Sequence, residues 1–265
     1  MLELIFVILI LGIVSSIGAE IIAKVYEQYI LQRAQHRASL KTELASLQIA
    51  NRLHYAIGGT VYRIKNTGTL EPIESSFAAG HGNDYVGLQW VGYDADSFEA
   101  VNTSSGREPG WSGFCDLNAS SKKKIKTLGS KLALTDNIIK NLSSNTKDLS
   151  NATLYFPYQT TEHNVSGYTG DDIIDLDNDT LTIAEQYKLA WTSYALKVEN
   201  GDLYLYYNFT PSPAAALGTT KKLLLKNIST FKFKGSAGGI RFKICKEERI
   251  SNDFNITACK EKVAF

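Results

Sequence analysis

Residues 1–19 carry apolar side chains almost without interruption. After Glu3 there is no charged residue until Glu20, and Leu, Ile, Val, Phe and small residues fill the interval. An α-helix rises about 1.5 Å per residue, so about twenty residues cross the roughly 30 Å hydrocarbon core of a bilayer. The pattern therefore predicts a membrane-spanning helix over residues 1–19. The carboxylate of Glu3 is costly in such a segment, which predicts that it has a partner there.

The helical pattern continues beyond the apolar run. Residues 20–57 contain neither Pro nor Gly, and apolar residues recur mostly three or four positions apart, with charged residues between them. This spacing predicts an amphipathic helix that stops at Gly58-Gly59, and one helix over residues 1–57 would be roughly 85 Å long. We expect its apolar stripe to pack against a folded domain. The stripe consists of Ile22, Val25, Tyr29, Ile30, Leu40, Leu44, Leu47 and Leu53.

Two β-hairpins are predicted in the last third of the chain. Residues 186–197 and 203–209 have strand character and flank an Asn-Gly dipeptide, which favours a tight hairpin turn. Residues 230–234 and 240–245 flank a glycine-rich turn, and apolar and basic residues alternate along both. One face of this second hairpin should carry Phe231, Phe233, Ile240, Phe242 and Ile244, and the other Lys232, Lys234, Arg241 and Lys243.

The middle of the chain gives weaker signals. Short strands are expected at residues 60–64, 84–93 and 151–158, and a short helix at residues 132–142. An apolar sheet face and a helix stripe bury each other. The sequence therefore predicts an α+β fold in which the helix of residues 1–57 packs against an antiparallel sheet of a globular domain over residues 58–265.

The N-terminal segment MLELIFVILILGI resembles the mature N-terminus of type IV pilins and of the pseudopilins of type II secretion. Glu3 falls on the glutamate of that family, and residues 4–13 fall on its apolar run. The family's basic leader, its glycine before the cleavage site and its first two mature residues do not precede Glu3 here. A chain trimmed near the cleavage site and a late start are the two alternatives. The family's helix-breaking proline would fall near Glu20 and is absent there.

The resemblance implies a lollipop-shaped subunit of a short filament. In the family, a prepilin peptidase removes the leader, an assembly platform in the inner membrane extracts the helix, and the glutamate neutralises the N-terminal amine of a neighbouring subunit. Glu3 is therefore the expected assembly residue, and other pilin-like subunits are the expected partners. The implied location is the inner membrane, with one span and the globular domain in the periplasm. Such a filament serves protein secretion or DNA uptake, and the large domain favours a minor subunit.

Segments of the last third, among them YKLAWTSYAL, DLYLYYNF and STFKFKG, resemble large pseudopilin-like proteins that occur beside secretion and natural-transformation components in campylobacter-like bacteria. Two alternatives compete for the N-terminal segment: a cleaved secretory signal, which would show a basic region and an A-x-A site, and a generic single-span anchor. The alternative function is a membrane-anchored periplasmic ligand-binding domain that does not polymerise.

The chain has three cysteines, Cys115, Cys245 and Cys259, which suits a periplasmic domain with one disulfide. Cys245 and Cys259 would close a loop of about fifteen residues. The resemblance supports this pair, because many pilins carry a C-terminal disulfide. Cys115 is then free, or it pairs with either of the others. The cysteines lack C-x-x-C spacing, and none of His36, His54, His81 and His163 adjoins them, so a zinc site is not expected.

An acidic run contains Asp175, Asp177 and Asp179, the every-second-residue spacing of oxygen ligands in calcium loops. Some pseudopilins bind calcium. However, Thr180 stands where the loop motif has Gly, and Gln186 stands where it has Glu. A calcium site and a solvated acidic loop are the two interpretations.

The basic face of the last hairpin is a candidate DNA contact. Lys232, Lys234, Arg241 and Lys243 would offer the phosphate-binding surface that a DNA-uptake filament needs. The alternative is a solvated sheet face whose charges prevent edge-to-edge aggregation. The net charge of the chain is only +1, so there is no global attraction to nucleic acid.

Asn118, Asn164 and Asn255 are candidate glycosylation sites. Each lies in an N-x-[ST] sequon with an acidic residue two positions upstream, a form that bacterial oligosaccharyltransferases prefer. The alternative is a chance match in a chain rich in Asn, Ser and Thr. The motifs G-x-S-x-G, H-E-x-x-H and the Walker loop do not occur, so we expect no enzyme and, apart from calcium, no cofactor.

Overall fold

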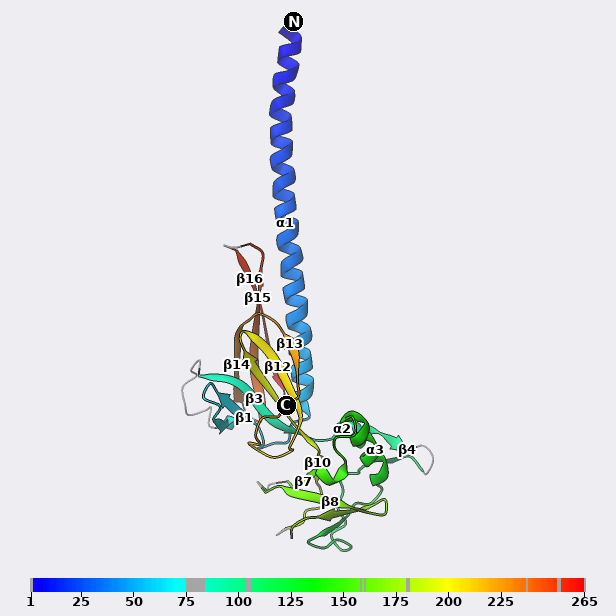
Figure 1. The fold of residues 1–265 in the computed structure, drawn as a ribbon. Coiled ribbons are helices and arrows are strands. Elements are labelled where there is room, and N and C mark those ends of the chain that lie inside the picture. The colour runs from blue at the N-terminus through cyan, green and yellow to red at the C-terminus, as the bar shows by residue number, and fades with distance from the viewer. Residues whose placement is uncertain are drawn as a thin grey trace.

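The computed structural model describes residues 2–74, 84–102, 106–157, 159, 161–179, 182–236, 238–251 and 254–264. Its dominant element is α1 (Leu2–His54), a helix of 53 residues whose N-terminal part stands clear of the remaining chain (Figure 1). The helix ends at His54, earlier than the sequence pattern predicts. The amide of Ile57 bonds instead to the carbonyl oxygen of Val91, 2.9 Å away, which ties the chain to strand β3 (Tyr85–Gly92).

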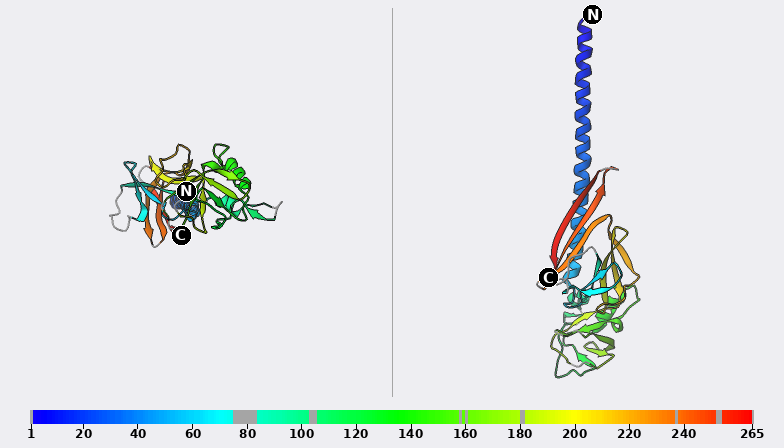
Figure 2. Two further views of the ribbon diagram at one scale, coloured as in Figure 1. Left: turned by 90° about the horizontal axis from the view of Figure 1, so that it is seen from below. Right: turned by 90° about the vertical axis from the view of Figure 1, so that its left-hand side faces the viewer.

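Two antiparallel sheets pack against the C-terminal half of α1 (Figures 1 and 2). The six-stranded sheet has the order β13-β12-β11-β3-β1-β2, and the three-stranded sheet has the order β14-β15-β16. Their other strands are β1 (Tyr62–Lys65), β2 (Leu70–Pro72), β11 (Thr192–Glu199), β12 (Asp202–Phe209), β13 (Lys221–Leu225), β14 (Ile228–Ser236), β15 (Gly239–Arg249) and β16 (Asn255–Ala264). This arrangement confirms the predicted α+β class.

Both predicted hairpins are present. Asn200 and Gly201 have positive φ angles of 52° and 80° in the turn between β11 and β12, as an Asn-Gly turn requires. In the second hairpin, Phe231 is opposite Ile244 and Phe233 is opposite Phe242, so the apolar residues share one face. The sequence pattern missed β16, which adds a third strand beside β15.

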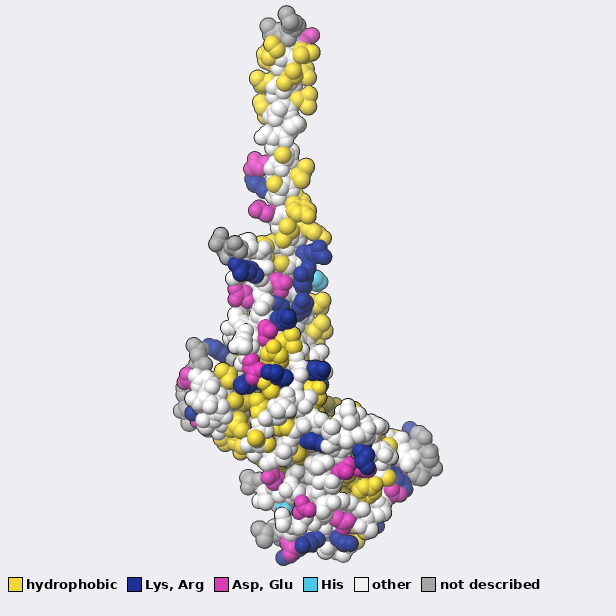
Figure 3. Space-filling view, in the orientation of Figure 1, with side chains coloured by type: hydrophobic (Ala, Val, Ile, Leu, Met, Phe, Trp, Pro, Cys, Tyr) yellow, Lys and Arg dark blue, Asp and Glu magenta, His cyan; other side chains and the backbone are white. Residues whose placement is uncertain are grey.

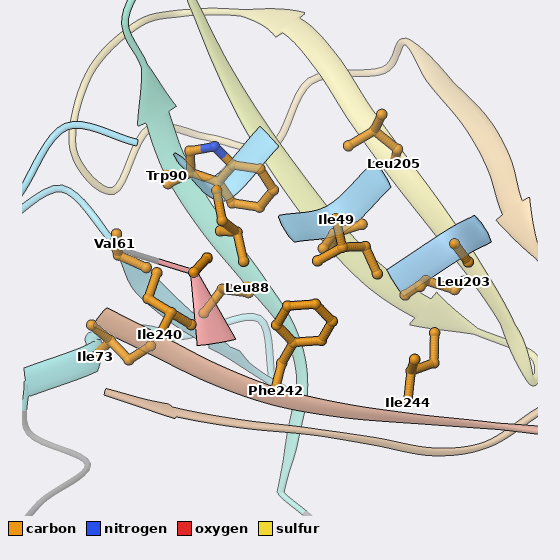
Figure 4. Packing of buried hydrophobic residues seen from close by; sticks show 14 of the residues in the cluster. Ile49, Val61, Ile73, Leu88, Trp90, Leu203, Leu205, Ile240, Phe242 and Ile244 are labelled. Atoms are coloured by element: carbon orange, nitrogen blue, oxygen red, sulfur yellow. The ribbon is translucent and has the colours of Figure 1, made fainter. Parts of the chain in front are cut away.

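One hydrophobic core joins α1 to both sheets (Figure 4). Ile49 of α1, Trp90 of β3 and Phe242 of β15 are each at most 1% exposed. Burying such a side chain contributes about 1.5–3 kcal/mol relative to leaving it in water. The helix is therefore held by contacts with both sheets rather than by the propensity of its own sequence.

The face of α1 that enters this core differs from the predicted one. Leu40, Leu44 and Leu47 are 52%, 52% and 41% exposed, so their predicted burial is wrong. Ile22, Val25, Tyr29 and Ile30 of the same predicted stripe are also exposed, and of its members only Leu53 is buried. The buried residues of the helix are Ala38, Thr42, Ala45, Ser46, Ile49 and Leu53. Most of these side chains are small, which lets the sheets approach the helix backbone closely and leaves the larger leucines outside.

A second lobe lies at the end of the molecule farthest from the N-terminus (Figure 1). Its five-stranded antiparallel sheet has the order β10-β7-β8-β9-β6. The chain leaves the six-stranded sheet after Gly92 and returns to it at Thr192, and these two residues are paired across β3 and β11. The elements between them are α2 (Ala95–Glu99), β4 (Val101–Asn102), β5 (Glu108–Pro109), β6 (Lys124–Lys126), α3 (Leu132–Leu142), the 3-10 helix Leu149–Asn151, β7 (Thr153–Tyr155), β8 (His163–Thr169), β9 (Ile173–Leu176) and β10 (Lys188–Ala190).

This distal lobe has a hydrophobic core of its own, which contains Trp111, Leu132 and Ile139. The predicted helix at residues 132–142 is α3. The predicted strand at residues 186–197 is divided instead between β10 of the distal sheet and β11 of the six-stranded sheet.

Asp94 lies where the chain passes into the distal lobe. Its amide bonds to the carbonyl oxygen of Leu189 at 2.7 Å, and its own carbonyl oxygen accepts from Nε1 of Trp111 at 2.9 Å. Its carboxylate caps α2 by accepting from the amide of Ser97 at 3.2 Å. The side chain is buried, and this burial raises the pKa of Asp94 from 3.8 to about 6.

Asp94→Asn is expected to stabilise the protein at pH 7. The folded-state pKa of Asp94 is raised, so its contribution to stability is greatest below about pH 4 and is lost as the pH rises through about 6. The buried charge at pH 7 costs up to about 3 kcal/mol, and Asn retains the capping function. Urea unfolding of the full chain in detergent should show a more stable variant at pH 7 and little difference at pH 4. A variant that differs equally from the wild type at both pH values would contradict this assignment.

Candidate assembly surfaces

The N-terminal part of α1 is the first candidate surface. Among the described residues, α1 alone is long and apolar enough to cross a membrane, and its apolar window has no cover from the rest of the molecule. Glu3 lies in the first turn of this helix and is exposed. The structure therefore places the predicted assembly residue at the bare end of a candidate membrane span.

The second surface is the leucine stripe, which we define as Leu40, Leu44 and Leu47. It lies on the side of α1 opposite to Ala38 and Ala45, which the sheets cover. Toward the N-terminus the same side continues into Ile22, Tyr26 and Tyr29, all exposed. Figure 3 shows apolar side chains along much of the bare helix, interrupted by charged ones. A row of exposed leucines on a folded helix indicates a contact with another apolar surface.

Ion pairs attach the hairpin of β15 and β16 to α1 on the N-terminal side of the hydrophobic core. This hairpin runs beside the helix toward its N-terminus (Figure 2). Glu43 of α1 lies 3.2 Å from the amine of Lys260 and 2.8 Å from that of Lys262. Hydrogen bonds from Lys262 and Lys260 lower the pKa of Glu43. Arg37 lies 3.9 Å from Glu248.

A disulfide joins Cys245 to Cys259, as predicted. The two residues are directly opposite each other on β15 and β16, so the bond links neighbouring strands of the hairpin. Cys115 is a free cysteine in the core of the distal lobe, with its Sγ 3.4 Å from Oγ of Ser120. Burial raises the pKa of the Cys115 thiol, which disfavours the reactive thiolate.

Replacing both Cys245 and Cys259 by alanine is expected to lower the free energy of unfolding by about 3 kcal/mol, the chain-entropy value for a loop of this length. Urea unfolding in detergent would measure the difference. Dithiothreitol should destabilise the wild type by a similar amount and leave the double variant unchanged. Equal sensitivity of both proteins to the reductant would show that the bond does not stabilise the fold.

The structure brings the four predicted DNA-contact residues together. Lys232 is opposite Lys243, and Lys234 is opposite Arg241, on the face of the three-stranded sheet away from α1. Arg241 forms an ion pair with Glu261 of β16, which offsets one of the four charges. The patch is therefore compact and basic, and DNA contact stays a prediction.

Two of the three predicted calcium ligands have side-chain contacts with other residues, and the backbone amide of Asp177 donates to the carbonyl oxygen of Asn164 at 3.0 Å. Asp175 lies 3.7 Å from Lys124 and accepts from Oγ1 of Thr169 at 2.7 Å, and Asp179 lies 3.7 Å from Lys123. Thr180 lies outside the described residues. Within the parts of the chain that are described, no group of three or more His, Cys, Asp or Glu side chains is arranged to hold a metal ion.

The three candidate glycosylation sites are exposed, but in different settings. Asn118 lies in a turn, where Oδ1 of Asp116 accepts from its backbone amide at 3.0 Å. Asn164 lies within β8, and Oδ1 of its side chain accepts from Thr153. Asn255 begins β16, and its side-chain amide bonds to Glu247. Asp253, the acidic residue of the third sequon, and His81 lie outside the described residues.

No family model, curated protein or solved structure matches this chain. The architecture itself, a long apolar N-terminal helix packed on antiparallel sheets, is consistent with that of pilins. The candidate membrane span and the disulfide together suggest a membrane-anchored domain outside the cytoplasm.

The sequence pattern did not reveal that the leucine stripe is an exposed surface. The available signal was the second row of residues on α1, at spacings of three and four, formed by Ala38, Thr42, Ala45 and Ile49. Small residues at helical spacing permit close packing, so two rows on one helix indicate two different contacts.

Proposed function

We propose that this chain is a pilin-like structural subunit of a type II secretion or DNA-uptake pseudopilus. It is inserted in the inner membrane by residues 1–19, with its globular part in the periplasm. A prepilin peptidase and an inner-membrane assembly platform act on it, and other pilin-like subunits surround it in a short filament. The large folded part favours a minor subunit, with a structural rather than an enzymatic role.

The leucine stripe is the observation that carries this proposal. An anchored domain that works alone needs one helix face buried against its sheets and has no use for three exposed leucines on the opposite face. In a bundle of helices that stripe becomes buried, and each leucine then contributes about 1.5–3 kcal/mol. The same bundle supplies an apolar environment in which Glu3 neutralises the N-terminal amine of a neighbour, as the resemblance implies.

Glu3→Ala is the test of this function. The variant and the wild type are produced in the host from the full gene, and cross-linked or sheared polymer is quantified. We expect higher-order species from the wild type and at least a tenfold loss with Glu3→Ala, because the amine of the neighbour stays uncompensated. Absence of polymer from the wild type, together with normal secretion and DNA uptake after deletion of the gene, would overturn the proposal.

The runner-up is a membrane-anchored ligand-binding domain that does not polymerise. A cleft of about 430 Å³ between the turn after α1 and the distal lobe favours it. Ile57, Tyr62 and Tyr155 line the cleft, and Lys188 adds one cationic group. A periplasmic ligand would protect Tyr62, the more exposed of the two tyrosines, in a full-chain footprinting experiment, whether or not polymer forms.

The filament could serve either protein secretion or DNA uptake. The basic patch supports DNA uptake and consists of Lys232, Lys234, Arg241 and Lys243. Filaments should then be retained on double-stranded DNA at low ionic strength and released as salt rises. Retention that does not depend on salt, or no retention at all, would favour secretion.

A further inference from the structure

A groove lies beside the C-terminal end of α1, between the helix, α2 of the distal lobe and the strands β11, β12 and β13. It consists of two adjoining cavities of about 460 and 400 Å³ that share Gln48, Arg52, Asp96 and Tyr194. Each cavity is within the size range of small-ligand sites, which often lie between domains. Among the described residues, the groove shares none with the cleft that favours the runner-up function.

Aromatic rings form much of the lining of this groove. They belong to Tyr55, Tyr93, Trp191, Tyr194 and Tyr207. Tyr55 and Tyr93 hold each other in place, because the amide of Tyr93 donates to the carbonyl oxygen of Tyr55 at 2.9 Å and the two rings meet edge to face, with centroids 5.3 Å apart. The guanidinium group of Arg52 lies over Tyr194, 5.4 Å from the ring centroid. Rings held by such contacts need little reordering when a ligand binds.

Polar side chains line the groove beside these rings and are not used by the fold. Gln48 and Asn51 of α1 and Asp96 and Glu99 of α2 are all exposed. Within the described part of the chain, none of these four side chains has a hydrogen bond or an ion pair with another residue. Amide groups both donate and accept hydrogen bonds, carboxylates accept them, and the guanidinium group of Arg52 donates them. The groove therefore offers a ligand donors as well as acceptors.

The charges that line the groove balance each other. Arg52 and Lys222 are its basic residues, and Asp96 and Glu99 are its acidic residues. A strongly charged ligand, such as a nucleic acid or a phosphate, would gain little attraction from this set. A neutral ligand rich in hydroxyl groups would instead use every kind of polar group present, because a hydroxyl both donates and accepts hydrogen bonds.

We propose that this groove binds a neutral oligosaccharide. A sugar ring presents C–H groups on its faces, which pack on aromatic rings, and hydroxyl groups around its edge, which hydrogen-bond to the polar side chains. The two adjoining cavities would hold consecutive sugar units, with Arg52 and Tyr194 where the cavities meet. An extended peptide fits less well, because β13, the edge strand that would pair with it, lines only one of the two cavities. The inference goes beyond the proposed function, since a single copy of the chain forms the whole site.

Isothermal titration calorimetry of the full chain tests the class of ligand. The protein is kept in a detergent without a sugar head group, because a maltoside would compete for the groove. Maltotriose, cellotriose and chitotriose are the probes, and we expect at least one of them to bind with a Kd below about 1 mM. Absence of binding by all of these sugars would overturn the inference. Binding of a neutral peptide of Gly, Ser and Tyr in their place would assign the groove to peptides and would also overturn it.

Two substitutions in the groove locate the binding. Asn51→Ala with Asp96→Ala removes one exposed polar side chain from α1 and one from α2, and the Kd for the sugar should rise about tenfold or more as hydrogen bonds to it are lost. Asn178→Ala with Asp177→Ala makes the same two changes at exposed positions of the distal lobe that do not line the groove. This matched control should leave the Kd unchanged. Equal affinity of the wild type and the groove variant would place the sugar elsewhere and overturn the inference.

Tryptophan fluorescence provides the second measurement. Trp191 lines the groove, whereas Trp90 and Trp111, the other tryptophans of the chain, are at most 2% exposed and do not line it. The sugar should change the fluorescence of the wild type and not that of Trp191→Phe, while calorimetry still detects binding by this variant. A Trp191→Phe protein that keeps the full change would place the sugar beside another tryptophan and contradict the proposed site. Polymer formation enters none of these measurements, so a failure of the proposed function would leave their outcome unaffected.

Discussion

Replacing Leu40, Leu44 and Leu47 together by serine is expected to abolish polymer formation while the folded part of the chain stays intact. The three side chains are largely exposed, so their loss should change the free energy of unfolding by no more than about 0.5 kcal/mol per position. In a filament the same side chains are buried, and removing all three would cost several times the roughly 1.5–3 kcal/mol of one. Sheared polymer, normalised to the amount of subunit in the membrane, is the quantity to measure.

The distal lobe offers a matched control for that experiment. Leu117, Leu128 and Leu142 are 46%, 44% and 51% exposed, close to the values of the leucine stripe. Changing these three to serine removes a similar amount of apolar surface from the distal lobe instead of from α1. We expect normal polymer from this variant. Equal loss of polymer in both triple variants would point to a general effect on solubility. It would show that the leucine stripe has no specific role in polymer formation.

Phe242→Ala is expected to produce the largest change in stability, about 3–5 kcal/mol. The ring is 1% exposed and lies in the core that joins α1 to both sheets (Figure 4). Its removal leaves a cavity bounded by a helix and a sheet that cannot collapse on it without moving relative to each other. Urea unfolding of the full chain in detergent, followed by tryptophan fluorescence to which Trp90 of the same core contributes, measures the loss.

Lys243→Ala is the control for Phe242→Ala, because Lys243 is the next residue of β15 and points to the exposed face. Its expected effect is below about 0.5 kcal/mol. A loss for Phe242→Ala similar to that of the control would show that the helix and the sheets are held together elsewhere, with the ion pairs of Glu43 as the next candidate.

Local signals in the sequence were sufficient for the hairpins. The Asn200-Gly201 turn depends on two residues that tolerate positive φ, and the alternation along β14 and β15 depends on nearest neighbours. The length of α1 was also predictable, because Pro and Gly are absent between residues 20 and 57. In each case, the residues that determine the structure lie close together in the chain.

Contacts between segments that lie far apart in the chain were not predictable in the same way. α1 has apolar residues on both of its sides, and hydrophobicity alone favours the leucines as the buried set. The choice depends on how closely the sheets approach, which makes Ala38 and Ala45 the better contacts. β16 was missed for a related reason: its side facing α1 carries Lys260 and Lys262, whose partner Glu43 is more than two hundred positions away.

The candidate sites show the same difference between signals from nearby residues and contacts between distant segments. Cys245 and Cys259 were predicted as a pair from a short loop and a resemblance, and they are neighbours on adjacent strands. The spacing of Asp175, Asp177 and Asp179 suggested a calcium loop. In the fold, β9 extends through Asp175, and Lys124 and Lys123 of a separate segment lie 3.7 Å from Asp175 and Asp179, respectively, so calcium binding stays a prediction.

The paired positions of Gly92 and Thr192 have a consequence for how such a chain can change over evolutionary time. Everything between them begins and ends at one point on the six-stranded sheet, beside strands that already pair with each other. The distal lobe can therefore be enlarged, shortened or exchanged without altering the spacing of β3 and β11 or the packing of α1 against the sheets. If the chain assembles as proposed, the distal lobe is free to diversify, while the helix and the two sheets packed on it keep the shape that a repeating assembly needs.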